Sequence, residues 1–280
     1  MYRACIFILL LMTSCSFFDN QDTLPMYFEI DEVSLQTGPG QGFNTHNIDA
    51  VSVFADGFSI GVYKLPANIP VLQTREELDL SIFGVIRNNG IAANPVQYPF
   101  YAPLDFNYEF MPGESRQLDL EFSYDDMAKV INVGDFESFN ALALGFDNNP
   151  DIEFIRSAET EFGNFCGKIT VDQNNLSFQK TTFSRILRSE VIQGSIFLEM
   201  DYRNEIPFSL GILLFREDGL IVPFYKLVLT EQEEWNKIYL ELSNELADNQ
   251  TAEFSVLVGT PPGNSNTGSV WVDNIKILHF

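Results

Sequence analysis

The stretch WNKIYLEL, residues 235–242, alternates apolar and polar side chains with a period of two residues. Successive side chains of a β-strand point to opposite faces, so this pattern predicts a strand with Ile238, Leu240 and Leu242 in a core. The stretch SIFLEMDYR, residues 195–203, predicts a second strand of the same kind. Similar short runs recur between Gly, Asn, Asp and Pro, and long helical periodicity is almost absent. We therefore expect an all-β protein made of β-sandwiches.

The first residues have the form of an export signal. Arg3 precedes an apolar run, residues 4–12, that is too short to span a bilayer. The sequence LMTSC ending at Cys15 resembles a bacterial lipobox, which implies removal of residues 1–14 and lipidation of Cys15. Ser16 behind the cysteine implies, by the same resemblance, sorting to the outer membrane. An ordinary secretory signal with an incidental Cys15 stays open as the alternative.

Residues 15–25 are polar and acidic enough to form a flexible stalk behind the lipid anchor. The short signal, acidic leader and Asn/Phe-rich composition resemble lipoproteins of the Bacteroidota, many of which face outward. The tripeptide DTL around Thr23 resembles the O-glycosylation acceptor of that group. The resemblance implies a glycosylated, lipid-anchored protein of the outer membrane, facing the cell surface.

Acidic side chains dominate the charge, with 39 Asp plus Glu against 16 Lys plus Arg and a formal net charge of −23. This excess repels the phosphates of nucleic acids and anionic lipid head groups, so we expect no nucleic-acid partner. Carboxylates that converge would suit calcium. Once Cys5 and Cys15 are assigned to the leader, Cys166 is left without a disulfide partner.

The domain organisation follows from where the strand pattern weakens. Residues 125–150 mix helix-like, Gly and Asn/Pro signals without a strong strand, which indicates a boundary. Behind the signal peptide and the stalk, we expect three further segments. These are a first β-sandwich at 26–130, a linker at 131–149 and a second β-sandwich at 150–280.

The second half carries a more specific resemblance. An EMDY strand, the WNKIYLEL strand and a terminal VDNIKI strand occur in the order seen in the jelly roll of galactose-binding-like and carbohydrate-binding modules. The resemblance covers residues 150–280 and implies a glycan-binding jelly roll. The first half is similar, more loosely, to the Ig-like or PEGA-type sandwiches of envelope proteins, through ADGFSIGVYKLP at residues 55–66.

The polar faces of the two quoted strands supply the candidate ligand residues. If the faces adjoin in one sheet, their rings and charged groups suit a sugar, whose apolar face stacks on rings while its hydroxyls bind polar groups. The alternative is the solvated outer face of an ordinary antiparallel sheet. The candidates are Trp235, Lys237, Tyr239, Phe197, Glu199 and Asp201. Trp271 alternates with Ile275 and Ile277, and we expect it in the core.

A structural calcium ion is implied by resemblance to calcium-bearing jelly rolls. Asp273 matches the aspartate at the start of their last strand, and Asp151 and Glu153 lie near the first strand of the domain. Oxygen ligands of this kind suit a hard cation. The alternative is that Asp273 caps a turn beside Asn274.

The pentapeptide GFSIG, residues 57–61, matches the G-x-S-x-G elbow of serine hydrolases, with Ser59 as the nucleophile. The flanking strand patterns instead predict a hairpin with Asp56 and Gly57 in its turn. The only histidines are His46 and His279, so we expect no catalytic triad. The Gly-rich stretch 37–45 lacks a lysine and a following helix, and we interpret it as a plain loop.

Together these features predict a non-catalytic outer-membrane lipoprotein that engages a glycan or a protein partner at the cell surface through its jelly roll. Two other classes stay open. One is a structural subunit of an envelope assembly. The other is a glycoside hydrolase that uses two carboxylates.

Overall fold

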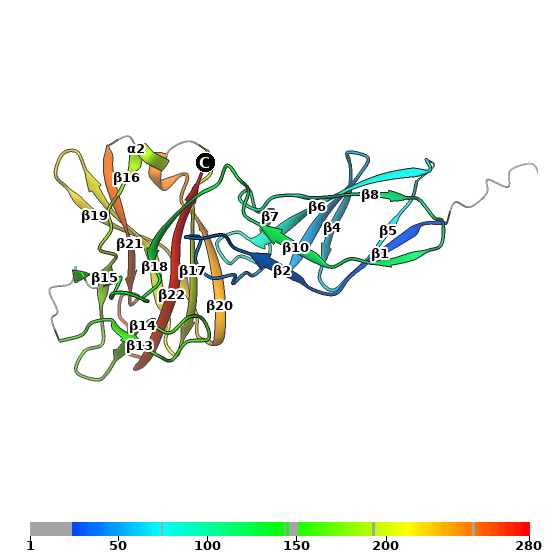
Figure 1. Ribbon diagram of the computed structural model, residues 1–280. Helices are drawn as coiled ribbons and strands as arrows, with labels where there is room; N and C mark the ends of the chain where they lie inside the picture. Colours follow the sequence, from blue (N-terminus) through cyan, green and yellow to red (C-terminus); the bar gives the residue numbers. More distant parts are fainter. Residues whose placement is uncertain (1–23, 74, 143, 146–150, 192–193, 248–249) are drawn as a thin grey trace, which may run out of the picture.

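The computed structural model describes residues 24–73, 75–142, 144–145, 151–191, 194–247 and 250–280, and almost all of its regular structure is β (Figure 1). Two β-sandwich domains lie end to end, which confirms the predicted fold class. The predicted signal peptide, Cys15 and Thr23 lie outside the described residues. Within the described ranges, no helix has the length and apolar character needed to cross a membrane.

The N-terminal domain packs two layers of strands around one apolar core. One layer has the order β5-β1-β9 and continues through the pair β10-β2; the other has the order β4-β3-β6-β7, with β8 also paired to β6. The strands are β1 (Met26–Ile30), β2 (Val33–Gln36), β3 (Ala50–Ala55), β4 (Phe58–Lys64), β5 (Ala67–Val71), β6 (Glu77–Arg87), β7 (Pro95–Gln97), β8 (Leu104–Glu109), β9 (Ser115–Gln117) and β10 (Leu120–Ser123). Alternate residues of β6 are buried, as a strand with one face on a core requires.

The β3–β4 connection is the hairpin that the sequence predicts. Asp56 and Gly57 both adopt positive φ (49° and 79°), the backbone conformation of a tight two-residue turn. Ser59 lies exposed on β4 and pairs with Phe54 across the hairpin. A strand therefore follows the turn at the position where a nucleophile elbow requires a helix.

The C-terminal domain is a sandwich of two antiparallel sheets. Sheet D has the order β13-β14-β22-β17-β20 with β11 on β22, and sheet F has the order β12-β15-β21-β18-β19 with β16 on β21. Two short helical segments, α2 (Arg188–Val191) and η1 (Glu245–Ala247), complete the domain. The strands are β11 (Lys129–Gly134), β12 (Leu144–Gly145), β13 (Ile155–Ser157), β14 (Cys166–Val171), β15 (Gln179–Thr181), β16 (Ile186–Leu187), β17 (Phe197–Asn204), β18 (Phe208–Arg216), β19 (Ile221–Leu229), β20 (Gln232–Glu241), β21 (Thr251–Gly259) and β22 (Gly268–His279).

The boundary between the domains lies before the predicted linker 131–149. Strand β11 pairs with β22 from Lys129 to Gly134, so it belongs to sheet D. Phe136 and Leu142, which follow β11, are also fully buried in the C-terminal core. The sequence pattern missed β11 because the polar Lys129 and Asn132 interrupt an otherwise apolar strand.

A β-bulge in β22 changes which face its side chains occupy. Between the pairs Glu199–Lys276 and Asp201–Asp273, β22 has one residue more than β17, and Asn274 has a positive φ of 51°. Ile275 joins the core, whereas Trp271 lies outside it, on the outer face of sheet D. Trp271 is buried, as expected, at 5% exposure, but it lies on the outer face and not between the two sheets, because the bulge breaks the strict alternation on which the expectation rested.

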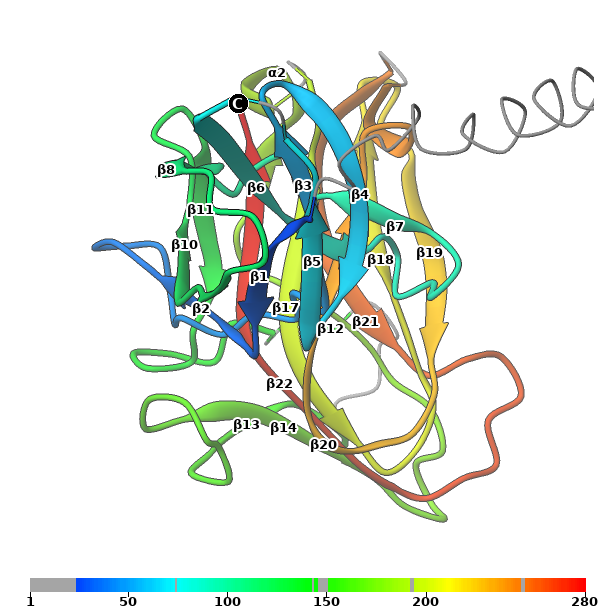
Figure 2. The ribbon, with the colours of Figure 1, turned by 90° about the vertical axis from the view of Figure 1, so that its right-hand side faces the viewer.

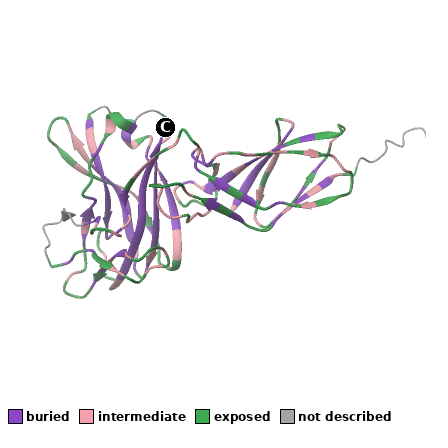
Figure 3. Cartoon of the chain, viewed as in Figure 1, coloured by how far each residue is buried: buried purple, intermediate pink, exposed green. Residues whose placement is uncertain are grey.

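The N-terminal domain packs against the outer face of sheet D, near the end of β22 (Figure 2). Its hydrophobic cluster includes Phe197, Tyr239 and Leu278 of the C-terminal domain. Figure 3 shows buried residues reaching the junction from both domains. The two domains are therefore joined by a continuous apolar contact as well as by the chain.

Candidate functional site

Two strands bring the predicted ligand residues together, as expected, because β17 and β20 pair directly in sheet D. Five of the six candidates are buried at the junction with the N-terminal domain: Phe197, Glu199, Asp201, Lys237 and Tyr239 are at most 4% exposed. The rings of Tyr98 and Phe197 meet edge to face at 5.2 Å between centroids. The prediction of an exposed face is wrong for these five residues, because strands and the β2–β3 loop of the N-terminal domain cover them. We call this region the covered half of the face.

A buried ionic network lies at the centre of the covered half. Glu199 is fully buried and faces the ammonium groups of Lys237 (3.2 Å) and Lys276 (3.5 Å). The hydroxyls of Tyr98 and Tyr124, from the N-terminal domain, each donate a hydrogen bond of 2.7 Å to its carboxylate. Groups from both domains thus satisfy one buried charge, which ties the domains together.

The pKa values of this network follow from its composition. Burial alone would raise the pKa of Glu199, but the two lysines and the two tyrosine hydroxyls hold it below its usual value. Burial opposes the charge of Lys237 too, and Asp201 and Glu199 raise its pKa above the ordinary value nevertheless. Lys276 differs, because burial and the neighbouring Lys237 lower its pKa to about 8.

The Gly-rich loop between β2 and β3 runs across sheet D. Phe43 donates its backbone N–H to Asn274 Oδ1 (3.1 Å), and the backbone oxygen of Gln41 accepts from Lys276 Nζ (2.9 Å). Gly42 has a φ of 78°, and a Cβ there would collide with the Asn274 side chain. The stretch is a loop, as predicted, but the glycine also lets it approach the second domain closely.

Thr45 of this loop links it to the remaining candidates. Its hydroxyl donates to Asp201 Oδ2 (2.6 Å) and accepts from Lys237 Nζ (3.1 Å). Asn274 Nδ2 also donates to Asp201, at 2.8 Å. Asp201 and Lys237 are therefore fixed in place, with their charged ends shared between the two domains.

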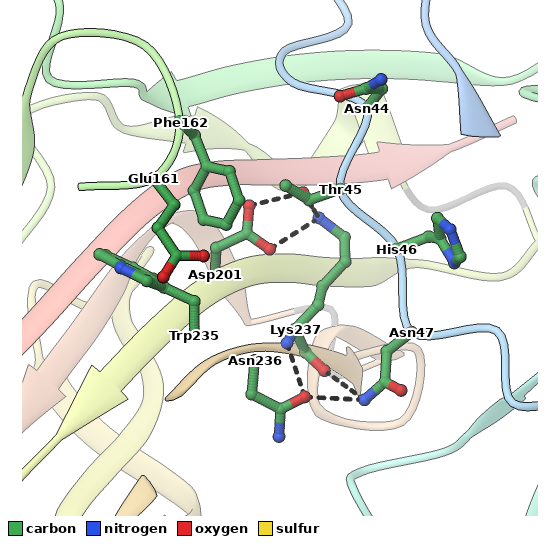
Figure 4. A pocket seen from close by; sticks show the side chains of 10 residues that line it. All are labelled: Asn44, Thr45, His46, Asn47, Glu161, Phe162, Asp201, Trp235, Asn236 and Lys237. Carbon is green, nitrogen blue, oxygen red and sulfur yellow. Dashed lines mark hydrogen bonds and ion pairs between the residues drawn. The ribbon is translucent and has the colours of Figure 1, made fainter. Parts of the chain in front are cut away.

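Beside these groups lies an open hollow of about 480 Å³, which we call the Trp235 hollow (Figure 4). Strand β20 provides Trp235 and Asn236, the loop before β14 provides Glu161 and Phe162, and the β2–β3 loop provides the opposite wall. The ring centroids of Trp235 and Phe162 lie 5.3 Å apart in an edge contact. The lining residues are Asn44, Thr45, His46, Asn47, Glu161, Phe162, Asp201, Trp235, Asn236 and Lys237.

The walls of the Trp235 hollow differ in chemistry. Trp235, Phe162 and Glu161 lie on one side, and His46 and Asn47 lie on the other (Figure 4). Asn47 Nδ2 donates to Asn236 Oδ1 at 2.8 Å, which holds its amide in place. Burial and the nearby Lys237 lower the pKa of His46, and its Nδ1 accepts a hydrogen bond from the backbone N–H of Ile48 at 3.4 Å. The hollow thus combines rings on one side with neutral hydrogen-bonding groups on the other.

Sequence reasoning found Trp235, Asp201 and Lys237 in this hollow and missed the rest of its lining. Phe162 and the 44–47 segment lie in loops, where no periodicity marks a side chain that faces a site. The nearest available signal was the Asn-rich end of the Gly-rich stretch, GFNTHN at residues 42–47.

Beyond Trp235, toward the start of β20, the outer face of sheet D is not covered by the N-terminal strands; we call this region the open half. The Arg203 guanidinium lies 4.2 Å from the ring centroid of Trp271 and 5.8 Å from that of Trp235. Lys168 lies over Trp271 at 4.9 Å. Glu159 pairs with Lys168 at 2.7 Å and with Arg203 at 3.9 Å. In this region charged side chains lie over the rings, and Trp271 beneath them is only 5% exposed.

The predicted calcium ligands do not converge. Asp273 is fully buried, whereas Asp151 and Glu153 are exposed. Across the described ranges, no three His, Cys, Asp or Glu side chains form a group that could hold a metal ion. Asp273 instead accepts a hydrogen bond from the backbone of Asn274, which matches the alternative of a local cap. The proposed ligand set is therefore not assembled, and the presence of calcium itself stays a prediction.

A buried carboxylate pair lies beside the Trp235 hollow, because Asp201 and Asp273 are register partners across β17 and β22. Burial raises the pKa of Asp273 to about 8, with the nearby charge of Asp201 adding to the shift. Both side chains are at most 1% exposed. A glycosidase needs its two carboxyl groups open to substrate and water, and this pair is not.

Comparison with known proteins finds solved structures that match this chain at low sequence identity. No family model and no curated protein matches the chain. A family 30 carbohydrate-binding module matches 52% of this chain and 87% of its own, at 13% identity and a TM-score of 0.43. The family 11 carbohydrate-binding module of a cellulosomal cellulase of Clostridium thermocellum matches 53% and 94%, at 11% identity and a TM-score of 0.40. The chain is thus similar to carbohydrate-binding modules, at values too low to assign a ligand to it.

Proposed function

We propose that this protein is a non-catalytic glycan-binding module whose sugar site is the Trp235 hollow. The observation that supports this proposal most is the pairing of Trp235 and Phe162 with amide, hydroxyl and imidazole groups across one hollow. Pyranose rings offer an apolar face and a rim of hydroxyls, and these two walls complement both. The volume of about 480 Å³ lies within the range of small-molecule sites.

The architecture supports the same proposal. Half of the hollow belongs to the jelly roll and half to the β2–β3 loop of the other domain, and Thr45, Asp201 and Lys237 bond the two halves together. A site whose walls are fixed before the ligand arrives loses less entropy on binding. The contact between the domains thus fixes the walls of the hollow in addition to joining the domains.

Glycan-array screening followed by calorimetry of the strongest ligand tests the proposal. Replacing Trp235 with alanine removes the indole wall, and we expect a loss of affinity of roughly 10- to 100-fold, since stacking contacts contribute about 1–3 kcal/mol. Phe58→Ala is the matched control, because Phe58 is 75% exposed on the distant β3–β4 hairpin. Binding that is undiminished in Trp235→Ala, or lowered equally in both variants, would exclude this site.

We further propose that the protein acts at the cell surface as a lipoprotein of the outer membrane, anchored through Cys15. The lipobox-like sequence before Cys15 supports this location. Labelled palmitate should be incorporated into the wild-type protein and not into Cys15→Ala. Equal labelling of the two proteins would place the lipid on another residue. No labelling of either protein would show that the chain carries no palmitate anchor.

A further inference from the structure

A second hollow, of about 630 Å³, lies in the open half of the face; we call it the Glu231 hollow. It follows the Trp235 hollow along the same two strands: Asp201 lines the first and Arg203 the second on β17, and on β20 Trp235 lines the first and Glu233 the second. Two residues of extended strand correspond to about 7 Å. The hollows are therefore neighbouring parts of one surface, with the Arg203–Trp235 contact between them.

The Glu231 hollow carries surplus negative charge. Glu205, Glu231 and Glu233 line it as exposed side chains, and among the described residues none of them has an ion-pair partner. The only cation in the lining, Arg203, already faces Glu159 and lies over Trp271. An anionic ligand is therefore repelled from this hollow, and a cationic group is attracted.

A buried acceptor without a partner lies in the same lining. Asn204 is 1% exposed, and its Nδ2 donates to the backbone oxygens of Ile206 (2.8 Å) and Thr230 (2.9 Å). Since both partners are acceptors, the orientation of the amide is fixed, and Oδ1 is left without a hydrogen bond. A buried polar atom in this state costs about 1–3 kcal/mol, and such atoms concentrate where a ligand or a reaction uses them. Among the described residues, the same lining also holds two buried donors without a hydrogen bond, Arg203 Nε and Trp271 Nε1, so both an acceptor and donors are unsatisfied here.

We propose that the Glu231 hollow binds the protonated amino group of an amine-bearing sugar, whose next unit occupies the Trp235 hollow. This inference rests on the proposed function and narrows its ligand to an oligosaccharide with at least one free amino group. An ammonium group can donate three hydrogen bonds, which suits carboxylates such as Glu231 and Glu233. Acetylation of the amine removes the charge and two of the three donors.

The test compares an oligomer of glucosamine with the same oligomer after N-acetylation, by calorimetry at fixed salt. We expect the free amine to bind more tightly to the wild-type protein. The double variant Glu231→Gln/Glu233→Gln should lose about 3- to 10-fold in affinity for the amine and little for the acetylated form, because exposed charge pairs contribute up to about 1 kcal/mol each. Glu231 lies in the β19–β20 connection and Glu233 near the start of β20, and both are exposed, so the fold should tolerate the change.

The control is Glu109→Gln/Glu121→Gln, which removes the same charge from exposed positions of the N-terminal domain. Equal loss in the control would show attraction to the overall net charge and overturn the proposal. Equal affinity of wild type for both oligomers, with binding still lowered by Trp235→Ala, would overturn this inference alone. Absence of binding of either oligomer together with an empty glycan array would overturn the proposed function as well.

Discussion

The covered and the open halves of the sheet D face both combine aromatic and charged side chains, but only the covered half is buried beneath another domain. In the covered half, Glu199, Lys237 and Lys276 lie among tyrosines and are buried beneath another domain. In the open half, the half-buried Arg203 lies over the buried Trp271 ring and faces the exposed Glu159. A face of rings and charges on one strand pair can therefore serve as an interdomain contact or as a binding surface. Which role it takes depends on whether another part of the chain covers it.

The covered half should show the largest effect on stability. Glu199→Gln leaves two lysines buried without their shared carboxylate, and we expect a loss of about 3–5 kcal/mol in the free energy of unfolding. Urea denaturation followed by fluorescence measures it. A loss below 1 kcal/mol would show that water reaches the network and that the two halves do not differ as described.

The second effect depends on pH and is intermediate in size. Lys276 has a pKa of about 8 in the folded protein against 10.5 unfolded, so between these values the unfolded state binds more protons. Its contribution to stability should therefore be least favourable below pH 8 and improve as the pH rises through it. We expect the wild-type free energy of unfolding, relative to Lys276→Met, to rise by about 1–2 kcal/mol from pH 8 to 9.5. A flat difference across this window would mean that Lys276 is not desolvated in solution.

The open half should show the smallest effect. Glu159→Gln removes the partner of Lys168 and Arg203, but the Glu159 side chain is 51% exposed and its ion pairs are screened by solvent. We expect a change under about 1 kcal/mol in the same urea assay. A loss as large as that of Glu199→Gln would erase the distinction between the halves.

Strand alternation was enough to predict the fold class and the two faces of the two key strands, whereas their pairing was only a condition of the ligand hypothesis. The residues of WNKIYLEL and SIFLEMDYR face as predicted, with Ile238, Leu240 and Met200 in the core. The prediction of the domain boundary was less accurate, because β11 is polar in part and gains its stability from pairing with β22. Trp271 is buried as predicted, but its face was not predicted, because a bulge at Asn274 is not visible in an alternating pattern.

The covering of Glu199 and Tyr239 could not be read from the sequence. Tyr98, which bonds to Glu199, lies 101 residues away in another domain. Alternation separates the two faces of a strand, but it carries no information about what packs on the outer one. The same limit applies to Thr45 and Phe162, whose places in the hollow depend on the paths of two loops.

The contact between the domains also determines how far the Trp235 hollow lies from the N-terminal end of the described chain. Strand β1, the first strand of the described chain, begins at the end of the N-terminal domain farthest from the jelly roll (Figure 1). The longest strand of the N-terminal domain, β6, has 11 residues and spans about 36 Å. The ionic network and the Gly-rich loop hold the two domains together. A chain tethered to a bilayer at its N-terminal end would therefore keep the Trp235 hollow at a fixed distance from the membrane, with the N-terminal domain as the spacer.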